Sequence, residues 1–132
     1  MLLFAISNCA NTQDNDQVFE VVEEMPRFPG CEHLKDLEER RLCAQNKMLA
    51  FLYKELTIQP IKKNASICTT LVYRFIIEKD GSISNIEELK SCDDYHANVR
   101  TMLEQMPKWI PGKKDGQAVR VRFNLPIRPH FK

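Results

Sequence analysis

The sequence has little of what marks several large classes of protein. Its 19 lysines and arginines nearly balance 18 acidic residues, so the net charge of +1 gives no general attraction to nucleic acid or to an anionic membrane. None of the four glycines belongs to a glycine-rich phosphate-binding loop. The sequence contains no internal repeat, no low-complexity tract and no basic and aromatic platform on which nucleic-acid bases would stack.

What is present is typical of one globular domain. The chain has 132 residues, 43% of them hydrophobic, which is enough for a single domain with a buried core. Charge is unevenly distributed, since residues 1–40 carry nine acids and three bases whereas residues 107–132 carry seven bases and one acid. The two ends could therefore meet, or the basic end could meet an acidic partner; the alternative is an ordinary solvated surface.

The N-terminus combines a short apolar run with a cysteine. Met1–Ile6 is too short to span a bilayer and lacks the basic residues that begin a secretory signal. The stretch that ends at Cys9 resembles a bacterial lipobox, and a polar stretch follows as far as Gln17. We expect residues 1–17 to be a truncated lipoprotein signal and a polar tether, with a lipid anchor on Cys9. The alternative is a frayed terminus with a chance cysteine.

Periodicity in the middle of the chain predicts one helix and one hairpin. Apolar residues at helical spacing predict a helix over 45–56 that Pro60 ends, whereas residues 31–42 are predicted to be irregular or weakly helical. Alternation over 70–79 predicts a strand, and the following Asp-Gly pair predicts a tight turn with positive φ at Gly81. The spacing of the apolar residues after Ile83 predicts a bulge in the returning strand.

The C-terminal part predicts a second helix and a last strand. Asp93 or Asp94 would cap the helix, and its core stripe would be Tyr95, Val99, Met102, Leu103 and Met106. Alternation over 119–125 predicts the strand, which Pro126 closes. The order helix, strand, strand, helix, strand predicts an α+β fold, with a three-stranded antiparallel sheet and two helices packed on one face. The run 18–22 is a candidate extra strand.

Several of these segments occur together in one known family. They are Phe75–Ile83, the helix end at Met106–Trp109, the loop Pro111–Gly116 and the strand Val119–Ile127, with Met25–Gly30 and Gln59-Pro60 upstream. Together they resemble the C-terminal domain of Bacteroidetes-type TonB energy transducers. The loop and the valine-rich strand are the most specific part, and we expect residues 18–132 to form one such domain.

The resemblance implies a periplasmic, membrane-anchored binding module that has no catalytic activity and no cofactor. In that family a short peptide of a TonB-dependent outer-membrane receptor adds as a strand to the edge of the sheet. The residues that would pair with it are Arg120, Val121, Arg122, Phe123, Asn124 and Leu125. A supporting loop would contain Trp109, Pro111, Gly112 and Gly116, with the tryptophan as a core anchor. A homodimer formed by strand exchange is a further expectation.

Charge at this predicted edge has two interpretations. Arg120 and Arg122 alternate with apolar residues, so they would steer an acidic peptide or protect the edge from aggregation. The run Val18–Val22 would fold back along the last strand as an internal competitor, with Glu20 and its acidic neighbours facing the basic end. Deleting Met1–Glu24 would then strengthen the binding of a receptor peptide.

An energy transducer also needs an inner-membrane helix and a long proline-rich spacer, and neither lies in these 132 residues. We therefore expect a lipid-anchored adaptor, a paralogue that works with separate inner-membrane motor subunits, or part of a truncated reading frame. A different class of function is a structural envelope lipoprotein that keeps the fold without binding receptors.

The cysteines bear on the compartment. Setting Cys9 aside leaves four, which suits two disulfides in an oxidising periplasm and allows three connectivities. A bridge between Cys31 and Cys43 would staple a charged segment with little core of its own. If Glu78 pairs with Ser82 in the hairpin, Cys68 lies opposite Cys92, although a single bulge would turn the two side chains to opposite faces. Free thiols would instead favour the cytoplasm.

Catalytic and metal sites are the remaining alternatives. Cys92, Asp93 and His96 are close in sequence, but a nucleophilic cysteine needs a base and an orienting group that the fold must place. We expect the aspartate to be a cap and the histidine to lie on the surface. Cys31, His33 and Cys43 could be metal ligands, but Cys-x-His lacks the paired spacing of zinc sites, so we expect neither a metal nor an enzyme.

Overall fold

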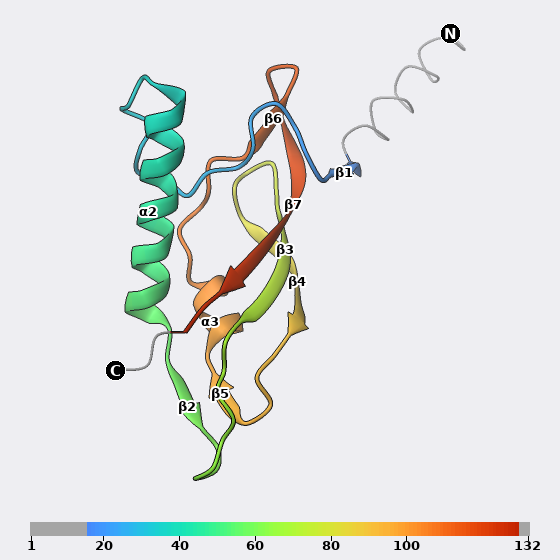
Figure 1. Ribbon diagram of the computed structural model, residues 1–132. Coiled ribbons are helices and arrows are strands. Elements are labelled where there is room, and N and C mark those ends of the chain that lie inside the picture. The colour runs from blue at the N-terminus through green and yellow to red at the C-terminus, as the bar shows by residue number, and fades with distance from the viewer. Residues whose placement is uncertain (1–15, 130–132) are drawn as a thin grey trace, which may run out of the picture.

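The structure, a computed structural model, describes residues 16–129 (Figure 1). The elements are β1 (Val18–Phe19), α2 (Leu37–Glu55), β2 (Ile58–Pro60), β3 (Leu71–Ile77), β4 (Ile83–Lys90), β5 (Tyr95–Ala97), α3 (Val99–Glu104), β6 (Gly112–Lys114) and β7 (Gln117–Ile127). The expected lipid site, Cys9, lies outside the described residues, as does most of the expected tether.

The centre of the sheet is the predicted antiparallel trio, in the order β7-β3-β4. β3 lies between the other two strands, and its β-branched and aromatic residues alternate so that Leu71, Tyr73, Phe75 and Ile77 are buried on one face. Its register with β7 is unbroken from Leu71↔Ile127 to Ile77↔Val121. The hairpin from β3 to β4 closes as predicted, with φ +88° at Gly81.

The prediction of a three-stranded antiparallel sheet is corrected by two added strands. β1 pairs in parallel with β7, at Val18↔Arg120 and Phe19↔Val121, and it is shorter than the predicted run 18–22. β6 pairs with the start of β7. A separate two-stranded sheet forms from β2 and β5. The fold is therefore α+β with mixed sheets.

The predicted bulge lies in β4. Ile76 pairs with Ser84 and Arg74 pairs with Glu87, so one residue is inserted between these pairs, and Asn85 takes φ 50° there. A second shift follows, because Val72 pairs with Lys90. Each one-residue shift turns the following side chains to the other face, so two shifts restore the original face.

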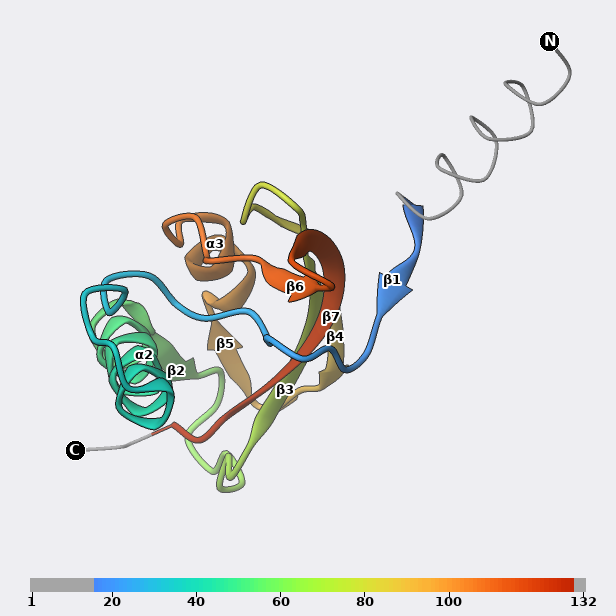
Figure 2. The ribbon, with the colours of Figure 1, turned by 90° about the horizontal axis from the view of Figure 1, so that it is seen from above.

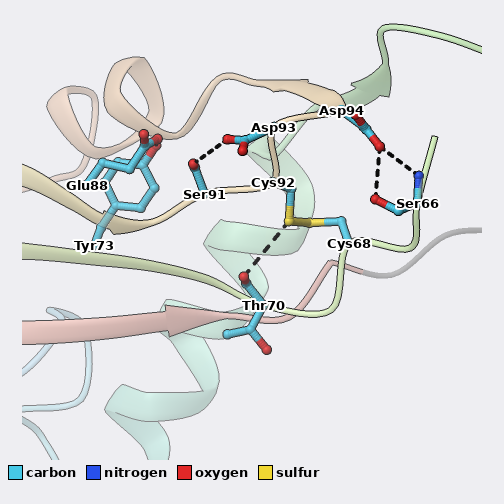
Figure 3. Close-up of a disulfide and its surroundings, with 9 residues drawn as sticks. All are labelled: Ser66, Cys68, Thr70, Tyr73, Glu88, Ser91, Cys92, Asp93 and Asp94. Carbon is cyan, nitrogen blue, oxygen red and sulfur yellow. Dashed lines mark hydrogen bonds between the residues drawn. A yellow bond between two sulfur atoms is a disulfide. The ribbon is translucent and has the colours of Figure 1, made fainter.

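This restored face explains how Cys68 and Cys92 meet. They form a disulfide with Cα atoms 5.6 Å apart, at the open end of the hairpin (Figure 3). A single bulge would have separated them. The second expected pair is also bonded, since Cys31 and Cys43 form a disulfide with Cα atoms 6.0 Å apart.

α2 begins eight residues earlier than predicted, so residues 37–42 are helical and not irregular. Asp36 caps the helix by accepting a hydrogen bond from the N–H of Glu39 at 2.9 Å. The apolar pattern did not show this first part because Leu37 and Leu42 are exposed. The helix ends at Glu55, and Pro60 belongs to β2 instead of ending the helix.

The second helix is shorter than predicted, and neither aspartate caps it. Tyr95 lies in β5, because residues 95–97 pair with β2, so α3 begins only after Asn98. Asp94 instead accepts hydrogen bonds from the N–H and the hydroxyl of Ser66, both at 2.9 Å (Figure 3). Asn98 accepts from the N–H of Thr57 at 2.8 Å, so its side chain joins the two short strands.

Both helices cover the same face of the main sheet, as predicted. One core cluster contains Leu52 of α2, the α3 residues Val99, Met102 and Leu103, and the alternate residues Leu71, Tyr73, Phe75 and Ile77 of β3. Figure 2 shows α2 and α3 on one side of β7 and β1 on the other. Trp109 is 3% exposed and packs edge-on against Phe28, Phe75 and Phe123.

Candidate functional site

The side of β7 that faces away from β3 is the candidate site. The N–H of Glu78, just after β3, donates to the carbonyl oxygen of Ser82, just before β4, at 2.8 Å, so the backbone groups of Ile77 point the opposite way, toward β7. Because the register between β3 and β7 is unbroken, the odd residues of β7 face β3. The N–H and C=O groups of Arg122 and Asn124 therefore point outward.

Pro126 supports this assignment of the edge. It lies within β7 and pairs with Val72 of β3, so the strand continues past the proline that was predicted to close it. A proline is tolerated inside a sheet only where its missing N–H would face away from a neighbouring strand. Its position, two residues after Asn124, fits an edge that faces away from β3.

Only the first part of this edge is covered by a described strand. β1 pairs at Arg120 and Val121, and no strand within residues 16–129 pairs with Arg122–Leu125 on that side. The predicted site residues thus fall into two groups: Arg120 and Val121 lie beside β1, whereas Arg122–Leu125 lie beside no described strand on that side. Their apolar side chains face the core, since Val121 and Leu125 are buried and Phe123 packs against Trp109.

Arg120 is held in place by the residues around it. Its Nε donates to Glu78 Oε1 at 2.7 Å, and its Nη1 donates to the carbonyl oxygen of Asp16 at 2.9 Å. The hydrogen bond from Arg120 holds the pKa of Glu78 below its ordinary value of 4.5. This arginine therefore ties β7 to the residue that follows β3 and to the N-terminal segment.

Arg122 also has a partner, on the N-terminal segment. Its Nη1 donates to Glu20 Oε1 at 2.5 Å, and both side chains are substantially exposed. Glu20, which was expected to face the basic C-terminal end, is thus paired with one of its arginines. An acidic ligand would have to displace Glu20 before it could use this arginine.

The supporting loop holds the hairpin of β3 and β4 against β7. The N–H of Trp109 donates to the carbonyl oxygen of Gly81 at 2.9 Å. A Cβ on Gly112 would lie 2.6 Å from Val121, so the backbone of β6 approaches the core closely. Asp115 and Gly116 both have positive φ in the two-residue turn to β7. Pro111 lies between Trp109 and this hairpin.

A groove that the sequence does not predict lies beside the edge. A cavity of about 380 Å³ lies between α2, residues 25–28 and residues 123–126 of β7. Met48 and Leu49 of α2 line it from one side, and Phe28 and Trp109 line its inner part. No single motif would have predicted it, because its walls come from three distant parts of the chain.

The structure does not bring the residues considered for catalysis and metal binding together as a site. Cys92 is bonded to Cys68, so it is not a free thiolate. Asp93 accepts a hydrogen bond from Ser91, and His96 lies in β5. Cys31 and Cys43 are bonded to each other. In residues 16–129, no group of three or more histidines, cysteines and acids is placed to hold a metal ion.

The described part of the chain contains no helix that is both long enough and apolar enough to cross a membrane. Comparison with curated proteins and with solved structures found no match. A family model described as Gram-negative bacterial TonB protein C-terminal matches residues 62–130, which include β3, β4, α3 and β7. This match spans just over half of the chain and includes the candidate edge. The chain therefore belongs to the TonB C-terminal family, whose members take part in TonB-dependent transport.

Proposed function

We propose that this protein binds an extended peptide of a TonB-dependent outer-membrane receptor as a strand added to β7. The observation that carries the proposal is the outward backbone of Arg122 and Asn124, which has no strand partner in the described chain. Unpaired strand groups form hydrogen bonds with an added peptide, and side-chain contacts supply selectivity. Binding, and not catalysis, is the function of this edge.

The family membership supports the cellular setting of this proposal. TonB C-terminal domains are periplasmic and associated with membranes. Acylation of Cys9 would anchor this domain to a membrane surface. Separate inner-membrane motor subunits would then supply any force.

The proposal is tested by removing one outward N–H group. Asn124 is exposed, so its replacement leaves the core unchanged. Asn124→Pro deletes the N–H that an added strand would use, and a β conformation at Phe123 is compatible with a following proline. Asn124→Ala is the matched control, because it removes the same side chain and keeps the N–H.

Isothermal titration with synthetic peptides from receptor N-termini measures the outcome. We expect Asn124→Pro to weaken binding by about tenfold or more, since it removes a backbone hydrogen bond and adds a steric block. Asn124→Ala is expected to bind within about threefold of the wild type. Equal binding by the wild type and the proline variant would contradict strand addition. A folded wild type that binds no receptor peptide would favour a structural envelope role.

A further inference from the structure

We infer that the groove between α2 and β7 is a side-chain subsite of the peptide-binding edge. It takes a large apolar side chain of the added strand, and Arg27 at its wall binds a carboxylate of the same peptide. This inference rests on the proposed strand addition and assigns the chemistry of the partner. α2 and residues 25–28 lie outside the residues that the family model matches, so this wall belongs to the N-terminal half.

The groove is continuous with the exposed edge. Phe123, Asn124, Leu125 and Pro126 line it, and they begin two residues after Val121, the last residue that pairs with β1. Side chains of a strand alternate between the two faces of a sheet. A strand added beside Asn124 would therefore direct every second side chain toward α2, into this space.

The walls of the groove are fixed before any ligand binds. Arg27 and Ile110 exchange two backbone hydrogen bonds, at 3.0 and 2.8 Å. The disulfide between Cys31 and Cys43 ties the chain just beyond Phe28 to α2. A volume of about 380 Å³ is near the lower end of the range of about 300–1,000 Å³ for small-ligand pockets. It therefore suits one or two side chains of a peptide.

Two donors beside the groove have no acceptor. Arg27 Nε and Trp109 Nε1 are buried, and no residue within 16–129 accepts a hydrogen bond from either. Buried N–H groups are paired in most proteins, so unpaired donors on two residues that line one groove are groups that a ligand with oxygen atoms would satisfy. An extended peptide brings carbonyl oxygens, and an acidic residue brings a carboxylate.

The charge of the groove favours a peptide with an acidic residue. Arg27 and Arg41 line it and no acidic residue does. Arg41 is already paired with Glu38 at 2.5 Å, whereas no salt bridge joins Arg27 to any described carboxylate. Arg27 is therefore the cation that is free to bind a carboxylate of the peptide.

The test uses the full chain and the receptor peptide that binds it most tightly. Binding is followed through the fluorescence of Trp109, the single tryptophan of the chain, which lines the groove. Protein variants are Arg27→Gln and Leu49→Ala. The control for the first is Lys54→Gln, which also replaces a cation by glutamine, and the control for the second is Leu42→Ala; both positions lie on α2 and do not line the groove. Peptide variants replace each apolar residue by alanine and each acid by its amide.

We expect Arg27→Gln and Leu49→Ala each to weaken binding by about tenfold, while both controls stay within about twofold of the wild type. Replacing the apolar peptide residue that enters the groove is expected to cost less affinity in Leu49→Ala than in the wild type. Likewise, replacing the acidic peptide residue that binds Arg27 is expected to cost less affinity in Arg27→Gln. Such non-additivity shows direct contact between the two groups. Amide exchange at Arg122 and Asn124 is measured in the same complexes.

The outcomes separate this inference from the proposed function. If the peptide protects the amides of Arg122 and Asn124 but binds all four protein variants equally, strand addition stands and the subsite is wrong. If the effects of protein and peptide changes add independently, the subsite is also wrong. If no receptor peptide protects those amides in folded wild-type protein, strand addition fails and the subsite fails with it.

Discussion

Gly81 lies where the hairpin of β3 and β4 touches the loop before β6. Its φ is +88°, and an added Cβ would lie 2.1 Å from the carbonyl oxygen of Trp109. Gly81→Ala is therefore expected to lower the free energy of unfolding by about 3 kcal/mol, because both the backbone conformation and the contact must change. Urea unfolding measures the loss.

Gly116 is the matched control for that variant. It also has positive φ, +79°, but nothing lies within 4 Å of an added Cβ. Gly116→Ala should therefore lower the free energy of unfolding by only about 1 kcal/mol, the cost of the conformation alone. Equal losses in the two variants would contradict the close contact between Gly81 and the tryptophan.

Glu78 makes stability depend on pH in a defined direction. Its hydrogen bond from Arg120 lowers its pKa below 4.5 in the folded protein. This contribution is fully present above pH 4.5 and is lost as the pH falls through the lowered pKa, because the carboxylate must then take up a proton. We expect Glu78→Gln to be less stable than the wild type at pH 7, with the difference shrinking below pH 4.5. A difference that stays constant from pH 7 to pH 3 would contradict this role.

β1 is held to β7 by few contacts, so it is suited to displacement. It has two residues, which pair with Arg120 and Val121. The other contacts of this segment are the hydrogen bond from Arg120 to the carbonyl oxygen of Asp16, the exposed pair of Glu20 with Arg122, and the ring of Phe19 under Lys114 at 4.8 Å. Exposed ion pairs contribute only about 0–1 kcal/mol. An arriving strand could therefore replace β1 at modest cost.

Deleting residues 1–21 tests whether β1 competes with the peptide. The structure narrows the expected deletion, because Glu24 exchanges two backbone hydrogen bonds with Lys113 and is better kept. The shortened chain is expected to bind receptor peptides about three- to tenfold more tightly, since the exposed ion pair of Glu20 that it removes contributes by itself about 0–1 kcal/mol. Glu20→Gln should give a smaller gain, and unchanged affinity in both would show that β1 does not compete.

The disulfide between Cys31 and Cys43 staples the segment before α2 to the helix. The two cysteines are 12 residues apart, so the entropic model of cross-links predicts a contribution of about 3 kcal/mol. The double variant Cys31→Ala, Cys43→Ala is expected to lose that much free energy of unfolding. As a control, reductant should lower the free energy of unfolding of the wild type, because it opens both disulfides. In the double variant it can act only on the disulfide between Cys68 and Cys92.

Elements were predictable where local chemistry decides them. The strands β3 and β7 and the hairpin followed from alternation and from an Asp-Gly turn. The start of α2 was missed because its first turns bury little apolar surface and depend on the cap at Asp36. The start of α3 was missed because pairing between β2 and β5, which are far apart in sequence, holds residues 95–97 extended.

At the scale of the whole molecule, the sequence predicted the strand that forms the site but not its surroundings. Apolar alternation identified β7, whereas the parallel pairing of β1 depends on how distant segments pack. The groove is invisible in the sequence for the same reason, since α2, residues 25–28 and β7 must first assemble. The proposed recognition surface is thus shared by the part that the family model matches and by the N-terminal half.

The most direct test of strand addition is amide hydrogen exchange measured by NMR on the full chain, with and without a receptor peptide. Arg122 and Asn124 carry the outward N–H groups, whereas Phe123 and Leu125 already face β3. Strand addition predicts that saturating peptide slows exchange at Arg122 and Asn124 by about tenfold or more and changes exchange at Phe123 and Leu125 little. Peptide binding that leaves exchange at Arg122 and Asn124 unchanged would contradict it.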